Sequence, residues 1–152
     1  YVSVDAPDRQ TFDDTVKAVE DGAWESLINT LDVLADKEDT RTVVRTTLVK
    51  GHNMHNPAWY AAMCQRADVD YVEMKAYMHV GHSRGRLDRE SMPSHDEVRA
   101  FTEEVGEFLP DHDVLKEVEE SHVTLLAQEE QTWVPKLEKS SDFWERDPVV
   151  SY

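Results

Sequence analysis

The chain has 152 residues, with 16 basic and 32 acidic side chains and a formal net charge of −16. That length suits one domain with its own core, no run of about 18 apolar residues could span a membrane, and we expect no secretory signal at the amino terminus. The single cysteine, Cys64, excludes an internal disulfide and an all-cysteine metal site, and the net charge argues against a general nucleic-acid binder.

Charge is distributed unevenly along the chain. Residues 1–40 carry 3 basic and 11 acidic side chains, residues 41–87 carry 7 and 3, and residues 88–152 carry 6 and 18, so a cationic middle lies between anionic flanks. Most carboxylates are simply a solvated surface. A chain this acidic also suits a cytoplasm of molar salt, where the Debye length falls to about 3 Å. We therefore expect a halophilic source and a cationic middle that meets an anionic ligand.

The first third of the chain alternates between strand and helix patterns. Residues 1–7 alternate apolar and polar side chains, which predicts a strand. A capping-box pattern from Thr11 to Asp14 predicts a short helix that starts there. An apolar stripe at helical spacing over residues 24–34 predicts a second helix, and the β-branched residues of 42–50 predict the next strand.

The middle of the chain continues this alternation. Asn56 followed by proline is a helix start, and we expect the helix to cover residues 57–66. Residues 70–79 predict another strand. Residues 81–93 hold two glycines and three arginines and predict a loop.

The last third begins with a helix and ends without a clear period. A capping box from Ser94 predicts a helix that Pro110 stops. Residues 114–127 predict one strand with a possible break near Ser121. The tail after Gln128 holds aromatic residues that predict packing on another surface: Trp133, Phe143, Trp144 and Tyr152.

The resulting order is strand, helix, strand, helix, strand, helix, strand. This alternation predicts an α/β fold with a parallel sheet and right-handed crossovers. Ligands of such sheets collect at the carboxyl ends of the strands. Because the chain opens inside a strand, we expect it to be a piece of a longer protein.

The strand over residues 70–79 has an unusual polar face. Val72, Met74, Ala76 and Met78 share one face, and the other face carries Tyr71, Glu73, Lys75, Tyr77 and His79. Burying a carboxylate or an ammonium without a partner costs several kcal/mol, so these groups either pair or line a site. A half-exposed sheet with one wet face is the alternative.

Histidines, arginines and the cysteine leave further alternatives open. His52 with His55, and His79 with His82, are spaced closely enough to be metal ligands, but neither pair lies in a known zinc motif. The loop arginines either bind phosphate or carboxylate or form ion pairs with the acidic flanks. Cys64 is expected to be a buried structural thiol.

Several segments also carry the pattern of a known family. They are Val-Ser-Val-Asp-Ala-Pro from Val2, Arg-Thr-Thr-Leu-Val-Lys-Gly-His-Asn-Met from Arg45, Asp-Tyr-Val-Glu-Met-Lys-Ala-Tyr-Met from Asp70, and the Gly-x-Ser-Arg and Met-Pro-x-His-x-Glu-Val stretches that follow. Together they resemble the radical-SAM tRNA 4-demethylwyosine synthases over about residues 1–127. Residues 42–54 and 70–98 are the specific part.

The resemblance implies a fold and a reaction. Residues 1–110 would be the C-terminal part of a radical-SAM partial (β/α) barrel, and residues 111–152 a wyosine-base-forming C-terminal extension. The family condenses N1-methylguanosine beside the anticodon of tRNA(Phe) with a two-carbon unit from pyruvate to give 4-demethylwyosine, a carbon–carbon lyase reaction. Its cofactors are S-adenosylmethionine and [4Fe-4S] clusters, and we expect a cytoplasmic monomer without a membrane segment.

The resemblance also implies roles for individual residues, inferred from strand position. The catalytic candidates are Lys50, Glu73, Lys75 and Tyr77. The cofactor-binding candidates are Ser3, Asp5, Arg45 and Asn53. The candidates for contact with the tRNA base are Ser83, Arg84, Arg86 and His95. No residue is assigned to a metal.

One departure from the family limits these expectations. Radical chemistry needs a Cys-x-x-x-Cys-x-x-Cys motif, which this chain lacks. We expect the cluster ligands to lie outside this chain, which would then be the C-terminal half of the enzyme and inactive alone. Two alternatives are a non-catalytic module that binds tRNA or another ligand, and an unrelated α/β enzyme that uses a histidine-bound metal.

Overall fold

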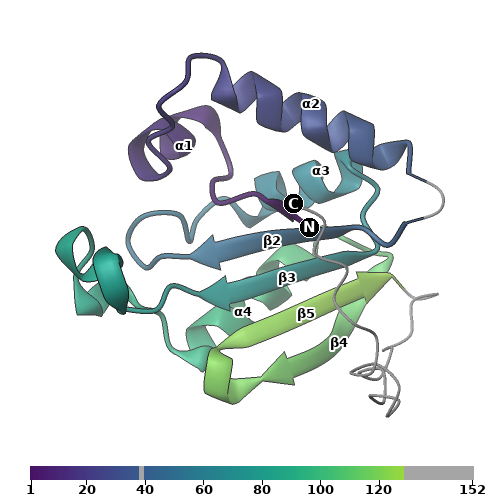
Figure 1. The fold of residues 1–152 in the computed structure, drawn as a ribbon. Coiled ribbons are helices and arrows are strands. Elements are labelled where there is room, and N and C mark those ends of the chain that lie inside the picture. Colours follow the sequence, from purple (N-terminus) through teal and green to yellow (C-terminus); the bar gives the residue numbers. More distant parts are fainter. Residues whose placement is uncertain (38–39, 129–152) are drawn as a thin grey trace, which may run out of the picture.

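The computed structural model describes residues 1–37 and 40–128, which form one mixed sheet with helices packed against it (Figure 1). The order of the described strands across the sheet is β1-β2-β3-β5-β4. Their bounds are Val2–Ser3 for β1, Val43–Leu48 for β2, Tyr71–Ala76 for β3, His112–Val118 for β4 and Val123–Gln128 for β5. The helices are α1 (Arg9–Thr15), α2 (Ala23–Ala35), α3 (Pro57–Arg66) and α4 (His95–Gly106).

The sheet is parallel on one side and antiparallel on the other. Strands β1, β2 and β3 pair in parallel, as the alternating pattern predicts. Strand β5 pairs antiparallel to β3, and β4 pairs antiparallel to β5, so the expectation of an all-parallel sheet is wrong for this half. The single strand expected over 114–127 is a hairpin, because the chain turns through Glu119–Ser121 and His122 takes a left-handed conformation. A turn this short can join only antiparallel strands.

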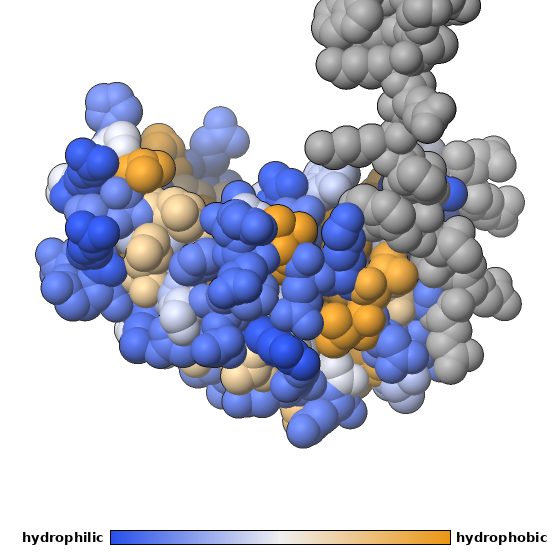
Figure 2. Space-filling view, turned by 90° about the horizontal axis from the view of Figure 1, so that it is seen from below, coloured by the Kyte–Doolittle hydropathy of each residue, from blue (hydrophilic) through white to orange (hydrophobic). Residues whose placement is uncertain are grey.

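The main core lies between the sheet and its helices. Side chains from β2, β3 and β5 pack there against α3 and α4, while Leu31 joins from α2. Val72, Met74 and Ala76 are at most 1% exposed, which confirms three positions of the predicted apolar face, whereas Met78 lies beyond the end of β3 and is 37% exposed. In Figure 1 no helix of the described part crosses the opposite face of β2, β3 and β5. Seen from below in Figure 2, the hydrophobic residues form separate patches within a mostly hydrophilic surface.

The helix starts follow local chemistry with two corrections. The capping box from Ser94 is present, since Ser94 Oγ accepts from Glu97 N–H and the Glu97 carboxylate accepts from Ser94 N–H. Helix α1 begins at Arg9 rather than at Thr11, because the Asp8 carboxylate caps it and accepts from Thr11 N–H. Asn56 precedes α3 as expected, but it takes a left-handed conformation and makes no side-chain capping bond.

Segment boundaries moved where a strand leaves its partner. The ladder of β1 covers only Val2–Ser3, and β3 ends at Ala76 rather than at residue 79. The expected loop over 81–93 contains two short 3-10 helices, η1 (Gly81–Gly85) and η2 (Arg89–Ser91). The aromatic side chains of the tail after Gln128 lie outside the described residues.

Candidate functional site

The carboxyl ends of β1, β2 and β3 surround a cavity of about 610 Å³, which we call the strand-end cavity. Its wall comes from the segments that leave these strands, from the end of α1 and from η1. The lining residues are Asp5, Asp14, Thr15, Val16, Lys17, Thr47, Val49, His52, Asn53, Tyr77, His82, Ser83, Arg86 and Leu87. Five candidates from the sequence meet here although they are far apart in the chain: Asp5, Asn53, Tyr77, Ser83 and Arg86.

Asn53 ties the exits of β1 and β2 together. It is fully buried, its Oδ1 accepts from Val49 N–H at 2.7 Å, and its Nδ2 donates to the carbonyls of Asp5 and Thr47 at 2.9 and 2.8 Å. The Tyr60 hydroxyl donates to the Asn53 carbonyl at 3.0 Å. Because both amide protons are committed to backbone carbonyls, the structure gives Asn53 a positioning role rather than direct contact with a ligand.

Asp5 lies at the same junction with its carboxylate at the cavity wall. Its Oδ1 accepts from Thr47 N–H at 2.7 Å. Burial raises the pKa of Asp5, although the hydrogen bond from Thr47 and the charge of Arg45 act in the opposite direction. A partly buried carboxylate whose described hydrogen bonds come from Thr47 is suited to accept more from a hydroxylated ligand.

Tyr77 connects the end of β3 to η1. It is 6% exposed, its hydroxyl donates to the Ser83 carbonyl at 3.4 Å, and its Oη lies 3.1 Å from Nδ1 of His79. Ser83 Oγ donates to the Val80 carbonyl, and Arg84 Nε donates to the His79 carbonyl at 3.2 Å. These bonds hold η1 in place beside the cavity, while Arg84 stays exposed.

The open face of the sheet carries the remaining strand candidates. Arg45 Nε donates to the Glu73 carboxylate at 2.6 Å, and the Arg45 guanidinium lies 4.7 Å from the ring centre of Tyr1. The interpretation that Glu73 pairs across the sheet is therefore confirmed, although its partner is on β2 and not Lys75. Lys75 has no ion pair among the residues that the structure describes, and it stands opposite Thr47 in the β2–β3 register. Ser3 is exposed on β1, the edge strand beside β2.

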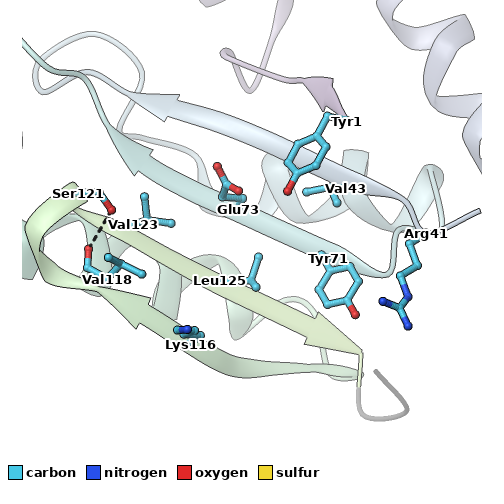
Figure 3. Close-up of a pocket in the computed structure, with 10 residues that line it drawn as sticks. All are labelled: Tyr1, Arg41, Val43, Tyr71, Glu73, Lys116, Val118, Ser121, Val123 and Leu125. Carbon is cyan, nitrogen blue, oxygen red and sulfur yellow. Dashed lines mark hydrogen bonds between the residues drawn. The ribbon is translucent and has the colours of Figure 1, made fainter. Parts of the chain in front are cut away.

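A second hollow lies along this open face (Figure 3). It has a volume of about 470 Å³, and the side chains labelled in Figure 3 line it. Most of its surface comes from apolar groups such as Val43, Tyr71 and Leu125, which form a small second core cluster with Ala127. Only Glu73 is shared between this hollow and the candidates from the sequence.

Two candidates point away from the strand-end cavity. The Lys50 ammonium pairs with the Glu97 carboxylate, and this pair lowers the pKa of Glu97. His95 Nε2 lies 3.0 Å from the Glu117 carboxylate, and its ring packs edge-on against His122 at 6.2 Å. Both residues are therefore engaged in contacts between α4 and the segments beside it.

Within the described residues the loop arginines show none of the ion pairs that the alternative expects. Arg84, Arg86 and Arg89 form no ion pair with any acidic residue in the described ranges, whereas the arginines at 9, 45, 66 and 99 all do. All three loop arginines are exposed. Their charges are thus available to an anionic ligand.

The histidine pairs and Cys64 form no metal centre in the part of the chain that the structure describes. No group of three or more His, Cys, Asp or Glu side chains is placed to hold an ion there. Cys64 is buried in α3, and burial raises the pKa of its thiol to about 12. This confirms the prediction of a structural thiol, since a reactive cysteine needs a lowered pKa.

Sequence reasoning missed part of the cavity wall. Asp14, Lys17 and Leu87 line it, yet none of them lies on a predicted strand. Lys17 takes a left-handed conformation after α1, which brings the end of this helix to the cavity. These residues could have been predicted from their place in the chain, because the loops that follow parallel strands lie at the same edge of the sheet.

Comparison with known proteins places this geometry in a family. Residues 66–128 match the family described as wyosine base formation. The chain is 44% identical over 131 residues to the S-adenosyl-L-methionine-dependent tRNA 4-demethylwyosine synthase of Pyrococcus horikoshii, and 38% identical over 137 residues to that of Methanocaldococcus jannaschii. Over most of its length the chain is therefore similar to tRNA 4-demethylwyosine synthases. These matches cover 86% and 90% of this chain but only 38% and 42% of the relatives, so the chain spans about two fifths of their length.

Solved structures of the family share the fold. A structure of TYW1 with a lysine-pyruvate adduct bound aligns with a TM-score of 0.76 at 36% identity, covering 90% of this chain and 43% of that one. An archaeal TYW1 crystal structure aligns with a TM-score of 0.66 at 30% identity, covering 88% of this chain and 40% of that one. The fold class expected from the family resemblance is thereby confirmed. None of the helices in the described residues is long and apolar enough to cross a membrane.

Proposed function

We propose that this chain is the C-terminal part of an enzyme that condenses N1-methylguanosine of tRNA(Phe), beside the anticodon, with a two-carbon unit from pyruvate to give 4-demethylwyosine. The observation that carries the proposal is the strand-end cavity, which gathers five family-matched residues at the edge where parallel sheets bind ligands. The relatives named as tRNA 4-demethylwyosine synthases support the reaction class. We further propose a cytoplasmic monomer and a boundary near residue 110, which falls between α4 and β4.

The strand-end cavity fits S-adenosylmethionine as a cofactor. Its volume of about 610 Å³ lies within the roughly 300–1,000 Å³ of small-molecule sites. Asp5 offers a partly buried carboxylate that can accept a hydrogen bond from the ligand. Asn53 holds the backbone of Asp5 and of Thr47 in place. Ser3 lies on β1, two residues before Asp5, and pairs with Arg45 on β2. We propose that both side chains contact the same ligand from the open face of the sheet. When bound, the cofactor would supply the radical that starts the condensation.

An iron–sulfur cluster does not fit this chain. A [4Fe-4S] cluster is held by several cysteine thiolates, and the sequence has only Cys64, which is buried with a raised pKa. We propose that the cluster ligands belong to the part of the relatives that this chain does not span. The chain alone would then fold and bind ligands without catalysis.

We propose that Glu73, Lys75 and Tyr77 form the wall against which pyruvate and the base react. One solved structure of TYW1 has a lysine-pyruvate adduct bound, which supports pyruvate as a substrate. Lys75 is the cation of this wall that lacks an ion pair among the described residues, whereas Arg45 already neutralises Glu73. Lys50, bound to Glu97, would act at the rim.

Ser83, Arg84 and Arg86 would face the tRNA. Support comes from Ser83 and Arg86, which line the strand-end cavity, and from guanidiniums that form no ion pair within the described residues and so suit phosphate oxygens. His95 is proposed for the same role, although its ring is held by Glu117 in this structure. Shape and base contacts would dominate binding, because attraction to phosphate weakens steeply with salt.

Lys75→Met provides the direct test in the complete enzyme. We expect product formation from N1-methylguanosine-containing tRNA and pyruvate to fall at least about 100-fold, the usual loss when one charge-stabilising group is removed. Thermal unfolding should stay unchanged, because Lys75 makes no described ion pair. Lys116→Met, on β4 of the same sheet, is the matched control and should keep most of the activity.

Two outcomes would contradict these proposals. Full activity of Lys75→Met would remove Lys75 from the reaction wall. A complete protein with its clusters that binds the tRNA but forms no product from pyruvate would favour the non-catalytic binding module instead.

A further inference from the structure

A second basic cavity lies next to η1, outside the strand-end cavity. It has a volume of about 490 Å³ and is lined by Met78, His79, Val80, Arg84, Arg89 and Met92. No carboxylate is among its lining residues. We call it the outer cavity. Of the residues given a role above, it shares Arg84.

Two lining residues of the outer cavity, Arg84 and Arg89, are positively charged, and we call them the rim. Neither forms an ion pair in the described ranges. Asp88 and Glu90 flank Arg89 in the sequence, yet neither carboxylate pairs with it. In a chain of net charge −16, two neighbouring guanidiniums without acidic partners are an unusual arrangement. Such a rim matches the oxygens of a phosphate.

Three other lining residues, Met78, Val80 and Met92, are apolar, and we call them the floor. Met78 is 37% exposed and Val80 is 57% exposed, so these side chains can be reached from solvent. Thioether and aliphatic groups of this kind cover the face of an aromatic ring well. A rim for phosphate beside a floor for a flat ring fits an unstacked nucleotide, since proteins bind single-stranded nucleic acid by combining cationic groups for the backbone with contacts to the faces of the bases.

The short helix η1 separates the outer cavity from the strand-end cavity. Ser83 and Arg86 line the strand-end side, while Arg84 lines the outer side. The Tyr77 and Ser83 hydrogen bonds described above fix η1 between them. A strand of RNA that places one base in the strand-end cavity would therefore carry its neighbour over η1.

We propose that the outer cavity binds an unstacked nucleotide adjacent to the modified guanosine, with its phosphate on Arg84 and Arg89 and its base on Met78, Val80 and Met92. This inference rests on the proposed function, because that function puts the guanosine in the strand-end cavity. It requires single-stranded RNA, since a base within a duplex cannot leave its stack to reach the floor.

The test measures binding of the full-length protein to a hairpin RNA that carries N1-methylguanosine in its loop. The RNA is used intact and with an abasic site on either side of the methylated base. Arg89→Gln and Met78→Gln change the rim and the floor. Arg41→Gln is the matched control, because Arg41 also forms no described ion pair but lies beside the open-face hollow.

Rim and floor should respond differently. Arg89→Gln should weaken binding of every RNA about fivefold and reduce the slope of log K against log salt by about 0.7, the value of one phosphate contact. Met78→Gln should weaken intact RNA about fivefold but leave one of the two abasic RNAs unchanged, because that RNA already lacks the base. Arg41→Gln should change affinity less than twofold.

Several results would overturn the proposal. One is an effect of Arg89→Gln no larger than that of Arg41→Gln. Another is a loss with Met78→Gln that is the same for intact and both abasic RNAs. Competition by an acidic peptide as strong as by RNA would assign the cavity to a protein partner. Measuring product formation separates this proposal from the proposed function. If the enzyme is active and the variants bind RNA normally, the role of the outer cavity is refuted. If the variants weaken RNA binding as expected but the enzyme forms no product, only the proposed reaction is refuted.

Discussion

At the scale of single residues, Asn53 illustrates a polar side chain that serves the site through the backbone. Its amide bonds three backbone groups at the exits of β1 and β2 and is shielded from water. A polar residue among strand-end loops predicts a ligand contact from sequence. The structure instead shows that both ends of the amide are occupied, so Asn53 holds Asp5 in place.

Asn53→Ala should therefore destabilise the fold. The change leaves one N–H and two carbonyl groups without partners in a buried site, and we expect a loss of about 3 kcal/mol in the free energy of unfolding. Urea unfolding measures it. Asn56→Gly is the control: Asn56 is exposed in a left-handed conformation without a capping bond, and glycine accepts that conformation. Equal losses for both variants would contradict the role of Asn53.

Asp5 gives a prediction about pH. Burial raises the pKa of Asp5, so the folded state binds the proton more tightly than the unfolded state. Stability attributable to Asp5 therefore falls as pH rises from its ordinary value of about 3.9 through the raised value, and stays low above it. Asp5→Asn should raise the free energy of unfolding at pH 7, and this gain should vanish below about pH 4.

Urea unfolding of both proteins across this pH range checks the Asp5 prediction. A native protein that gains stability relative to Asp5→Asn as pH rises would show that the carboxylate is stabilised rather than penalised. In the complete enzyme we expect Asp5→Asn to lower activity, because functional groups often persist at a cost in stability.

At the scale of elements, α4 is fixed by its first turn. The capping box of Ser94 and Glu97 satisfies two N–H groups, and Lys50 pairs with the same Glu97 carboxylate from the exit of β2. The start of α4 is thereby tied to the sheet edge that holds the strand-end cavity. This pairing explains why Lys50 is not among the residues that line the cavity.

Ser94→Ala should cost about 1 kcal/mol in the free energy of unfolding, the typical value for losing an N-cap. The matched control is Ser26→Ala in α2, where the serine is exposed and its side chain makes no described hydrogen bond. This control should change stability by less than about 0.5 kcal/mol. If Ser94→Ala is equally neutral, the capping box does not contribute.

At the scale of the whole molecule, the net negative charge opposes the proposed binding of RNA. The net charge of −16 repels phosphate, yet the loop arginines around η1 remain unpaired within the described chain. A local cationic site within an anionic protein would bind RNA by close contacts and would avoid non-specific attraction, which depends on the overall field.

The same net charge predicts that salt stabilises the fold. Raising KCl from about 0.1 M to about 1 M shortens the Debye length from about 10 Å to about 3 Å and screens repulsion among the carboxylates. The urea midpoint should therefore rise with KCl. An uncharged osmolyte at equal osmolality is the control and should raise it less. A midpoint that is independent of KCl would argue against a halophilic adaptation.

The sequence by itself determined the local features of this protein. The alternation in β3 fixed which side chains face the core, and the Ser94 pattern fixed the start of α4, because each depends on neighbours a few residues apart. Only the tertiary structure decided that β4 and β5 run antiparallel, that Asn53 bonds backbone groups, and that Lys50 meets Glu97. Such partners are distant in the chain, and their pairing depends on how the elements pack, which no local period encodes.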